Sequence, residues 1–285
     1  MKAAQVAIVG LGLMGGSLAM ALQQRQACRR VTALVRRPEV ARRAEGDGVV
    51  AWAATDPARV LAGADLVVLS TPVRTIIRHL DQFAPRFKPG AVITDLGSTK
   101  GEITARMAAL PPAVYPVGSH PMCGKEVTGL AAAEASLYQD APWVISPLPR
   151  TPPGAVRLVT DLALAVGARP VLMPPERHDR LVAAISHLPY TLAAALVLAA
   201  ETVAGNDDAV WSLAASGFRD TSRLAASDVT MMIDILLTNR NAVGAMLDGV
   251  RRVLDELAAA LAAGDETVLR ERLQRAHEQR TALYR

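Results

Sequence analysis

Cysteine is scarce in this sequence, and so are aromatic residues. The two cysteines, Cys28 and Cys123, lie far apart in the 285 residues, and their spacing matches no metal-binding motif. We therefore expect neither a disulfide framework nor a zinc or other metal site, and a reducing cytoplasm is the expected compartment. Aromatic residues make up only 4% of the chain, so its core must consist mainly of alanine, leucine and valine.

Long apolar runs are also missing. The short apolar stretch near the N-terminus is broken by glycines, which suit a nucleotide-binding turn better than a signal peptide. The longest later run, over residues 188–200, contains a proline and a tyrosine and is shorter than the roughly 20 residues that a membrane helix needs. The formal net charge of +4 fits an ordinary solvated surface. The sequence therefore predicts a soluble protein with neither a membrane nor a nucleic-acid partner.

The first half of the chain alternates short apolar runs with amphipathic stretches. We expect helices over residues 16–24 and from residue 38. Short continuous apolar strands separated by helices are typical of parallel βαβ units with helices on both faces of the sheet. The fold class is therefore α/β. The expected strands cover residues 6–9, 31–35, 66–69, 92–94, 114–117, 143–145 and 170–173.

The second half has a different pattern, because strands give way to long helical stretches after Pro174 and Pro175. These stretches cover residues 178–200, 207–215, 228–257 and 266–283. We predict a dinucleotide-binding domain over residues 1–174 and an all-helical substrate and dimerisation domain over residues 175–285. Its alanine- and leucine-rich faces indicate helix packing against a partner subunit, so a homodimer is expected.

A glycine-rich turn follows the first strand and opens the first helix. It reads Gly10, Leu11, Gly12, Leu13, Met14 and Gly15, which is the GxGxxG pattern in its required context. Gly10 permits the tight turn, Gly12 lets the backbone approach a pyrophosphate, and Gly15 lets the helix pack closely on the strand. The free N–H groups of the helix N-terminus suit phosphates. The turn therefore predicts dinucleotide binding.

The end of the second strand carries no acid that could bond the ribose hydroxyls of NAD. Arg36 and Arg37 stand there instead, and guanidinium groups suit a 2′-phosphate. We therefore predict NADP as the favoured cofactor, with NAD as the alternative. Ser70, Thr71 and Pro72 close the strand over residues 66–69 and are expected beside the cofactor, because ligands collect at the carboxyl ends of parallel strands.

Four polar features could take part in chemistry. Ser98 and His120 each follow a predicted strand and should reach the crevice of the glycine turn; histidine is a common proton acceptor, and a serine hydroxyl can orient it. His187 stands on an otherwise apolar helix, where a satisfied core histidine is the simpler interpretation. Residues 216–223, SGFRDTSR, predict an anion pocket. The residues alone indicate an NAD(P)-dependent oxidoreductase with an anionic substrate.

Together these segments resemble the prephenate/arogenate dehydrogenase family of tyrosine biosynthesis. The resemblance runs from VGLGLMGGSLA to SDVTMMIDILLTNR, and its most specific pieces are GSHPMCG, SHLP and GFRDTSR, in the family's order. It implies a Rossmann-type domain followed by a helical dimerisation domain. It also implies oxidative decarboxylation of prephenate to 4-hydroxyphenylpyruvate, or of L-arogenate to tyrosine, with hydride transfer to NAD(P).

The resemblance further implies roles for individual residues. His120, in the GSHP motif, would accept the proton of the substrate's ring hydroxyl, and Ser98 would bond both the histidine and that hydroxyl. Arg223, the last residue of GFRDTSR, would hold the ring carboxylate. His187 and Ser119 would contact the substrate.

One position departs from the family pattern. Many members that use prephenate carry a second histidine after SHLP, where this chain has Tyr190. The family places that residue near the substrate's side chain, which is a ketone in prephenate and carries an amino group in arogenate. Tyr190 is therefore a candidate substrate contact, and both substrates stay open.

Two alternatives compete with this interpretation. A β-hydroxyacid or imine-reducing dehydrogenase also joins a Rossmann domain to a helical domain, but it usually needs a lysine on the first interdomain helix. Residues 178–200 contain no lysine. A non-catalytic nucleotide sensor would keep the glycine turn without any need for Ser98, His120 and Arg223 together.

Overall fold

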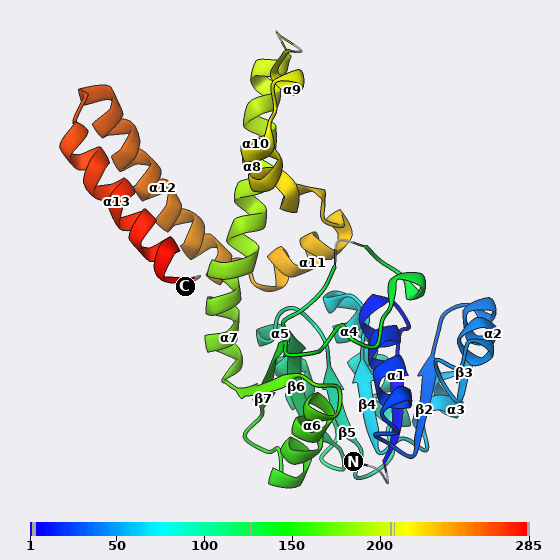
Figure 1. Cartoon of the computed structure of the whole chain (residues 1–285). Coiled ribbons are helices and arrows are strands. Elements are labelled where there is room, and N and C mark those ends of the chain that lie inside the picture. Colours follow the sequence, from blue (N-terminus) through cyan, green and yellow to red (C-terminus); the bar gives the residue numbers. More distant parts are fainter. Residues whose placement is uncertain (2–3, 126, 206, 208, 284–285) are drawn as a thin grey trace. The chain divides into compact units, whose positions relative to one another are not determined.

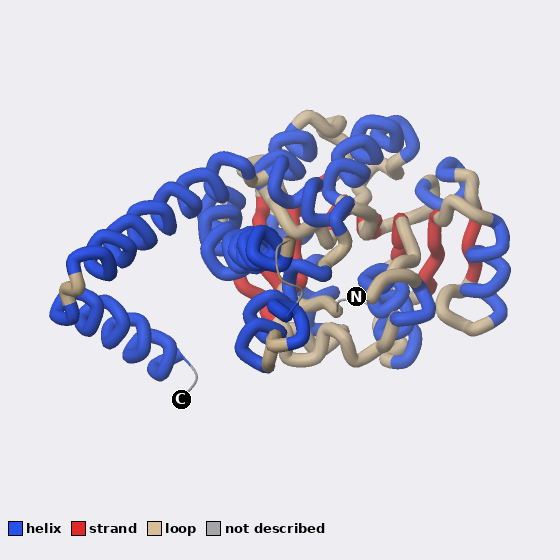
Figure 2. Tube along the Cα trace, turned by 90° about the horizontal axis from the view of Figure 1, so that it is seen from above, coloured by secondary structure: helices blue, strands red, loops and turns tan. Residues whose placement is uncertain are grey.

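A computed structural model describes the whole chain except residues 2–3, 126, 206, 208 and 284–285. The described residues form one eight-stranded sheet, and Figure 2 shows its strands as a row with helices on both sides. The strands are β1 (Gln5–Val9), β2 (Arg30–Leu34), β3 (Trp52–Ala54), β4 (Leu66–Leu69), β5 (Val92–Asp95), β6 (Tyr115–Pro121), β7 (Pro142–Pro147) and β8 (Arg169–Leu172).

Helices alternate with these strands through most of the sheet (Figure 1). They are α1 (Leu13–Gln24), α2 (Pro38–Gly46), α3 (Pro57–Leu61), α4 (Val73–Phe83), α5 (Gly101–Ala108) and α6 (Pro153–Ala165), with the 3-10 turns η1 (Ala84–Arg86) and η2 (Leu130–Ala132). The alternation confirms the α/β class, and the predicted strands agree with β1, β2 and β4 to β8 to within a few residues. The exception is β3, a three-residue edge strand too short to leave a period in the sequence.

The strand order is β3-β2-β1-β4-β5-β6-β7-β8. Strands β1 to β6 all pair in parallel, in the order of a doubly wound dinucleotide-binding sheet. The chain leaves β1 toward β2 on one side and returns to β4 on the other. A topological switch point therefore lies beside β1, at the carboxyl ends of the strands, and this is where such sheets bind ligands.

The expectation of parallel units throughout is wrong for β7, which runs antiparallel to β6. The connection over residues 122–141 holds only the short turn η2 and no crossover helix in its described part. A parallel pair needs such a crossover, whereas a loop can close an antiparallel pair. Strand β8 then pairs in parallel with β7, because helix α6 supplies the crossover.

The core lies on both faces of the sheet because side chains alternate along each strand. In β1, Ile8 belongs to one buried cluster with Leu18 of α1, and its neighbour Val9 belongs to the other cluster with Ile76 of α4. All four side chains are fully buried or nearly so. Each such side chain contributes about 1.5–3 kcal/mol by its burial, so the two clusters fix the sheet that presents the site.

The second half is helical, as predicted. Its elements are α7 (Pro175–Val182), a π-helical turn η3 (Ala183–His187), α8 (Leu188–Ala204), α9 (Ala209–Ser212), α10 (Ser216–Ser222), the 3-10 turn η4 (Arg223–Ala226), α11 (Val229–Thr238), α12 (Arg240–Ala263) and α13 (Glu266–Leu283). Two predicted helices are shorter than expected. Among the described residues, the helix over 207–215 contracts to α9, and the helix over 228–257 divides at Asn239 into α11 and α12.

The helical run that begins at α7 is not uniform. Pro189 has no N–H to donate, and its ring would clash with the carbonyl of Ile185 in a regular α-helix. The chain widens into the π-helical turn η3 over the residues just before it, and such turns are frequent at functional sites. The turn sets the rotation between α7, which carries His178 and Asp179, and His187 at the turn's end.

The run Pro175–Ala204 is also long and apolar enough to cross a membrane by length and composition, with 30 residues and a mean hydropathy of 1.8 in its most apolar window. The apolar run predicted from the sequence covered residues 188–200 alone, so this length was not predicted. One such helix is weak support for a membrane span. The run carries His178 and Asp179, which are buried and hydrogen-bonded to the sheet domain, so its first turns belong to the folded α/β unit.

The chain divides into two compact units, Met1–Asn239 and Arg240–Arg285. The first contains the sheet, its helices and α7 to α11. The second is the hairpin of α12 and α13, in which Arg272 pairs with Glu256 at 2.9 Å. All the residues described below as the candidate site belong to the first unit. The division at 174 and 175 between a nucleotide domain and a helical domain stays a prediction.

Candidate active site

The glycine turn has the geometry that its three glycines require. Gly10 has a φ of +98°, and a Cβ there would lie 2.8 Å from the Ser70 carbonyl oxygen. A Cβ on Gly15 would lie 2.0 Å from the Gly10 carbonyl oxygen, so the helix could not pack on the turn. A Cβ on Gly12, the N-cap of α1, would meet nothing within 4 Å. Open space therefore lies where a pyrophosphate would approach the helix N-terminus.

The other residues of this turn present backbone rather than side chains to a ligand. Leu11 and Leu13 are buried in the protein, and the Met14 carbonyl accepts a hydrogen bond from the Tyr138 hydroxyl at 2.6 Å. A phosphate at this turn would therefore contact the N–H groups of the first turn of α1.

The ends of β2 and β4 lie beside the glycine turn. The Gly10 N–H donates to the Leu34 carbonyl at 2.9 Å, so Arg36 and Arg37 follow directly beyond that contact. Both arginines are exposed, and Arg37 makes only a 3.4 Å ion pair with the exposed Glu39. Two exposed guanidinium groups thus follow the strand end that contacts the glycine turn.

The segment after β4 closes the other side of this corner. Ser70 donates its N–H to the Val9 carbonyl at 2.9 Å, and its hydroxyl oxygen is buried without a hydrogen-bond partner among the described residues. Thr71 packs against Gly10, and the exposed Pro72 is the N-cap of α4. The unpartnered hydroxyl, the open space at Gly12 and the free helix N-terminus all fit a dinucleotide.

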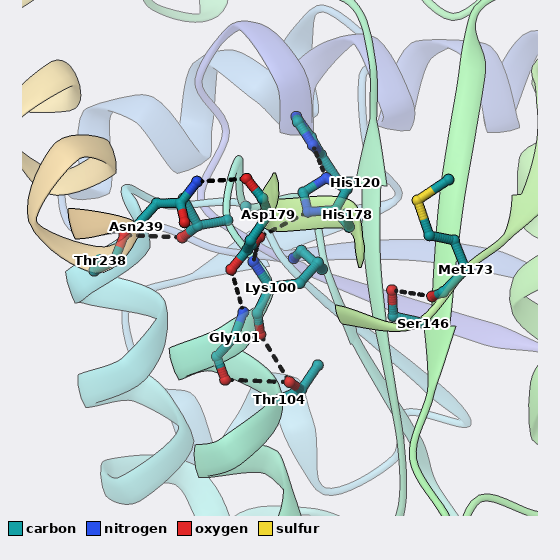
Figure 3. A network of polar contacts seen from close by, with 12 residues as sticks. Lys100, Gly101, Thr104, His120, Ser146, Met173, His178, Asp179, Thr238 and Asn239 are labelled. Atoms are coloured by element: carbon teal, nitrogen blue, oxygen red, sulfur yellow. Dashed lines mark hydrogen bonds and ion pairs between the residues drawn. The ribbon is translucent and has the colours of Figure 1, made fainter. Parts of the chain in front are cut away.

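His120 stands at the carboxyl end of β6 and begins a series of three side chains (Figure 3). Its Nδ1 lies 2.8 Å from Nε2 of His178, and Nδ1 of His178 lies 2.8 Å from Oδ1 of Asp179. Asp179 also accepts the backbone N–H groups of Lys100 and Gly101, both at 2.7 Å. The series therefore ties β6 and the start of α5 to helix α7.

The partners in this series determine where its protons lie. Burial acts to raise the pKa of the Asp179 carboxyl, but the hydrogen bonds from His178, Gly101 and Lys100 outweigh it and hold that pKa below its ordinary value. A carboxylate only accepts, so His178 must donate from Nδ1. Nε2 of His178 then accepts from Nδ1 of His120. This leaves Nε2 of His120 unprotonated, as a general base requires.

The surroundings also keep His120 neutral. Its removal from water lowers its pKa well below the ordinary value, and the nearby Lys100 ammonium acts in the same direction, as would a proton on His178 or His187. Lys100 is fully buried, as is its ion-pair partner Asp95. The Asp95 carboxylate also accepts the N–H groups of Gly97 at 2.8 Å and Ser119 at 3.0 Å, so it holds the loop between β5 and α5.

Ser119, a predicted substrate contact, precedes His120 on β6. Its side chain is fully buried and donates to the Asp95 carbonyl at 2.6 Å, while accepting from the Thr94 hydroxyl at 3.0 Å. Ser119 and His120 are neighbours on β6, and neighbouring side chains of a strand point to opposite faces. The Ser119 side chain therefore lies on the opposite face of β6 from His120 and bonds within the protein, and its contact with substrate stays a prediction.

Ser98 lies half-buried in the loop after β5, and in the described residues no hydrogen bond joins it to His120, whose partner is His178. Neither His178 nor Asp179 was predicted from the sequence as a site residue. The signal was present as an adjacent histidine and aspartate within α7, the first helix after β8. Nothing local shows that this pair reaches β6, because the contact spans 58 residues of sequence.

His187 lies within the same cluster, at the end of the π-helical turn. It is 1% exposed, and its Nδ1 lies 3.1 Å from Nδ2 of Asn239. Burial lowers the pKa of His187 to about 4; the Asp179 carboxylate opposes this shift, and a proton on His178 would add to it. Tyr190 is half-buried one helical turn later, and the exposed Arg223 begins η4, which packs on α8.

Comparison with known proteins gives the family. The nucleotide-binding domain of prephenate dehydrogenase matches residues 18–172, and its dimerization domain matches residues 174–275. This chain belongs to the prephenate dehydrogenase family. Family membership confirms the fold class, a Rossmann-type domain followed by a helical dimerisation domain. It also establishes an NAD(P)-dependent dehydrogenase of the prephenate/arogenate type.

Individual family members agree along nearly the whole chain. The cyclohexadienyl dehydrogenase of Zymomonas mobilis is 34% identical over 288 aligned positions, covering 98% of this chain and 95% of that protein. The prephenate dehydrogenase of A. aeolicus, solved with hydroxyphenyl propionate and NAD+, has a TM-score of 0.93 at 29% identity and covers 99% of both chains. Synechocystis arogenate dehydrogenase has a TM-score of 0.85 at 30% identity, covering 98% of this chain and 99% of its own.

Proposed function

We propose that this enzyme oxidises and decarboxylates prephenate or L-arogenate with His120 as the general base. The observation that carries the proposal is the series Asp179, His178, His120, which leaves Nε2 of His120 as an unprotonated acceptor at the carboxyl end of β6. Members of the family that resemble this chain are named for prephenate, arogenate or cyclohexadienyl substrates, which supports both substrates equally.

The chemistry follows from where the proton goes. His120 Nε2 takes the proton of the ring hydroxyl while the carbinol carbon gives up a hydride, so a ring ketone forms. A bound nicotinamide supplies the hydride acceptor. The bond to the ring carboxylate then breaks, carbon dioxide leaves, and the electron pair of that bond moves through the ring to the ketone oxygen. The resulting phenolate regains the proton held by His120, which gives the aromatic phenol and restores the neutral base. The imidazolium at His120 is stabilised because His178 accepts its Nδ1–H and Asp179 holds His178.

The remaining site residues have proposed roles. Ser98 would bond the ring hydroxyl. It lies half-buried in the loop after β5, at the carboxyl end of that strand. His187 and Tyr190 would line the pocket for the substrate's side chain. Arg223 would hold the ring carboxylate, since a guanidinium matches a carboxylate with two parallel hydrogen bonds.

Replacing Arg223 tests its role. Arg223 is exposed in the single chain, so we expect Arg223→Ala to raise KM for the substrate by about 30-fold, which corresponds to about 2 kcal/mol and lies at the low end for a lost charge pair. The cofactor KM should stay unchanged. Steady-state kinetics measures both, with the exposed Arg252→Ala as the matched control. An unchanged substrate KM would place the carboxylate elsewhere.

We propose NADP as the favoured cofactor, with NAD as the alternative. Support comes from the exposed Arg36 and Arg37 directly after the contact between Gly10 and Leu34. The double variant Arg36→Ser, Arg37→Ser should lower kcat/KM for NADP by about 10- to 100-fold, the scale of a charged hydrogen bond, and leave kcat/KM for NAD nearly unchanged. An equal loss with both cofactors, or higher kcat/KM with NAD in the unmodified enzyme, would contradict the proposal.

We further propose a cytoplasmic homodimer that forms through the helical half. The matching family domain is a dimerization domain. Apolar side chains of α8 and α11 are exposed in the single chain and would be covered by a second copy: Leu192, Leu198, Val203, Ile233 and Leu237. Their burial would favour association by about 25 cal/mol for each Å² removed from water.

One assay tests the proposed function. Reduction of the nicotinamide is followed at 340 nm with prephenate and with arogenate, each combined with NAD and with NADP. We expect reduction with at least one pair, and the most efficient pair gives the substrate and the cofactor. Absence of reduction with all four pairs, from folded protein that binds cofactor, would reject the proposal.

A further inference from the structure

Asn239 lies where helix α11 meets the catalytic cluster. It is the C-cap of α11 and only 6% exposed. Its amide nitrogen Nδ2 lies 2.8 Å from the backbone carbonyl oxygen of Asp179 and 3.1 Å from Nδ1 of His187 (Figure 3 shows the first contact). One side-chain nitrogen therefore joins α7, the π-helical turn and α11.

These two contacts fix the hydrogen-bond roles. The Asp179 carbonyl can only accept, so the atom of Asn239 that faces it must be the amide nitrogen; the opposite orientation would bring two acceptor oxygens together. The second N–H of that nitrogen faces His187, so Nδ1 of His187 must accept. A neutral imidazole that accepts at Nδ1 carries its proton on Nε2.

We propose that Asn239 is a positioning residue that holds His187 as a neutral ring protonated on Nε2, which makes His187 a hydrogen-bond donor to an acceptor oxygen of the substrate. The part that concerns substrate rests on the proposed function. The titratable groups that surround His187 are His178 and Asp179 of α7 and His120 of β6. Burial lowers the pKa of His187 to about 4, which agrees with a neutral ring.

His120 and His187 therefore have opposite hydrogen-bonding roles at Nε2. Nδ1 of His120 faces an acceptor, Nε2 of His178, so its own Nε2 is left to accept a proton. Nδ1 of His187 faces a donor, the Asn239 amide, so its Nε2 is left to donate. A substrate with a hydroxyl at one end and carboxylate or ketone oxygens at the other matches such a pair, because the hydroxyl donates and the oxygens accept.

The tautomer can be measured directly in the resting enzyme. Nitrogen-15 NMR of histidine-labelled protein distinguishes the two neutral tautomers and the imidazolium, and comparison with His187→Gln assigns the signals. We expect His187 to be neutral with its proton on Nε2 at neutral pH. A proton on Nδ1, or a charged ring, would overturn the inference. Because no substrate is present, the result stands apart from the activity assay, and inactivity with prephenate and arogenate would reject only the proposed function.

The variant Asn239→Asp tests the positioning role. A carboxylate has nearly the same shape but only accepts, so it should draw a proton to Nδ1 of His187 and raise the pKa of that ring. We expect the Nε2 tautomer signal to be lost and the substrate KM to rise about 5- to 10-fold, the scale of one lost hydrogen bond, with cofactor KM unchanged.

The exposed Asn241→Asp makes the same chemical change on α12 and should alter neither measurement. A variant that keeps the wild-type tautomer of His187, or a KM increase equal to that of Asn241→Asp, would overturn the positioning role. If Asn239→Asp does not fold, the wild-type NMR spectrum alone decides the tautomer.

Discussion

The His120→Asn enzyme is expected to lose about 10²- to 10⁴-fold in kcat while keeping its fold and its affinity for cofactor. Asparagine can still hydrogen-bond His178, but it offers no basic nitrogen to the ring hydroxyl. The hydride cannot leave the carbinol carbon efficiently unless the hydroxyl proton also leaves. The loss should therefore appear in kcat, with much less change in the KM for either substrate.

The matched control is His277→Asn, which makes the same substitution at an exposed position of α13 and should leave kcat unchanged. In the unmodified enzyme the active form has His120 deprotonated, so the rate should fall as the pH is lowered. Because burial and neighbouring charges depress the pKa of His120, this fall should come below the ordinary histidine pKa of about 6.5. Near-normal kcat in His120→Asn would remove His120 from the role of base.

The second large effect is expected on stability, from Lys100→Met. Lys100 and Asp95 form an ion pair in which both side chains are 0% exposed. Methionine fills the volume but leaves the Asp95 carboxylate buried without its counter-charge. Breaking one partner of a buried pair costs about 3–5 kcal/mol, and we expect that loss in the free energy of unfolding measured by urea denaturation.

The chain provides a matched control in Lys88→Met. Lys88 pairs with Asp65 at 2.6 Å, but the two side chains are 43% and 33% exposed, so this loss should be about 0–1 kcal/mol. The double variant Lys100→Met, Asp95→Asn should recover part of the stability, because it removes the unpaired charge as well. Equal losses in the free energy of unfolding for Lys100→Met and Lys88→Met would show that burial does not set the strength of the pair between Lys100 and Asp95.

Much of the fold was predictable because its signals are local. Strand β4 and helix α13 have the predicted bounds, since a short apolar run and a long periodic pattern are each visible within one window of sequence. The glycine turn was predictable for a similar reason. Gly10 and Gly15 are required by contacts within one strand-turn-helix unit and the strand beside it. The direction of β7 was not predictable in this way, because it depends on whether a crossover helix precedes that strand.

The candidate site was predictable only in part. His120 and His187 stand in short motifs, so sequence alone could select them as candidates. Ser119 stands in the same motif as His120, and the motif could not show that the two side chains point to opposite faces of β6. Whether a residue faces the crevice depends on the pleat of the strand, which is fixed by the packing of the whole sheet.

By itself the sequence determined the class of protein, the glycine turn and the candidate histidines, since each depends on residue type and short spacing. The tertiary structure alone decided the partners of those histidines. Asp179 and His178 reach His120 from a helix 58 residues away in sequence, and Asn239 reaches His187 across 52 residues. A histidine's proton is placed by whatever faces its other nitrogen, and only the packing of α7 and α11 against the sheet brings those partners into contact.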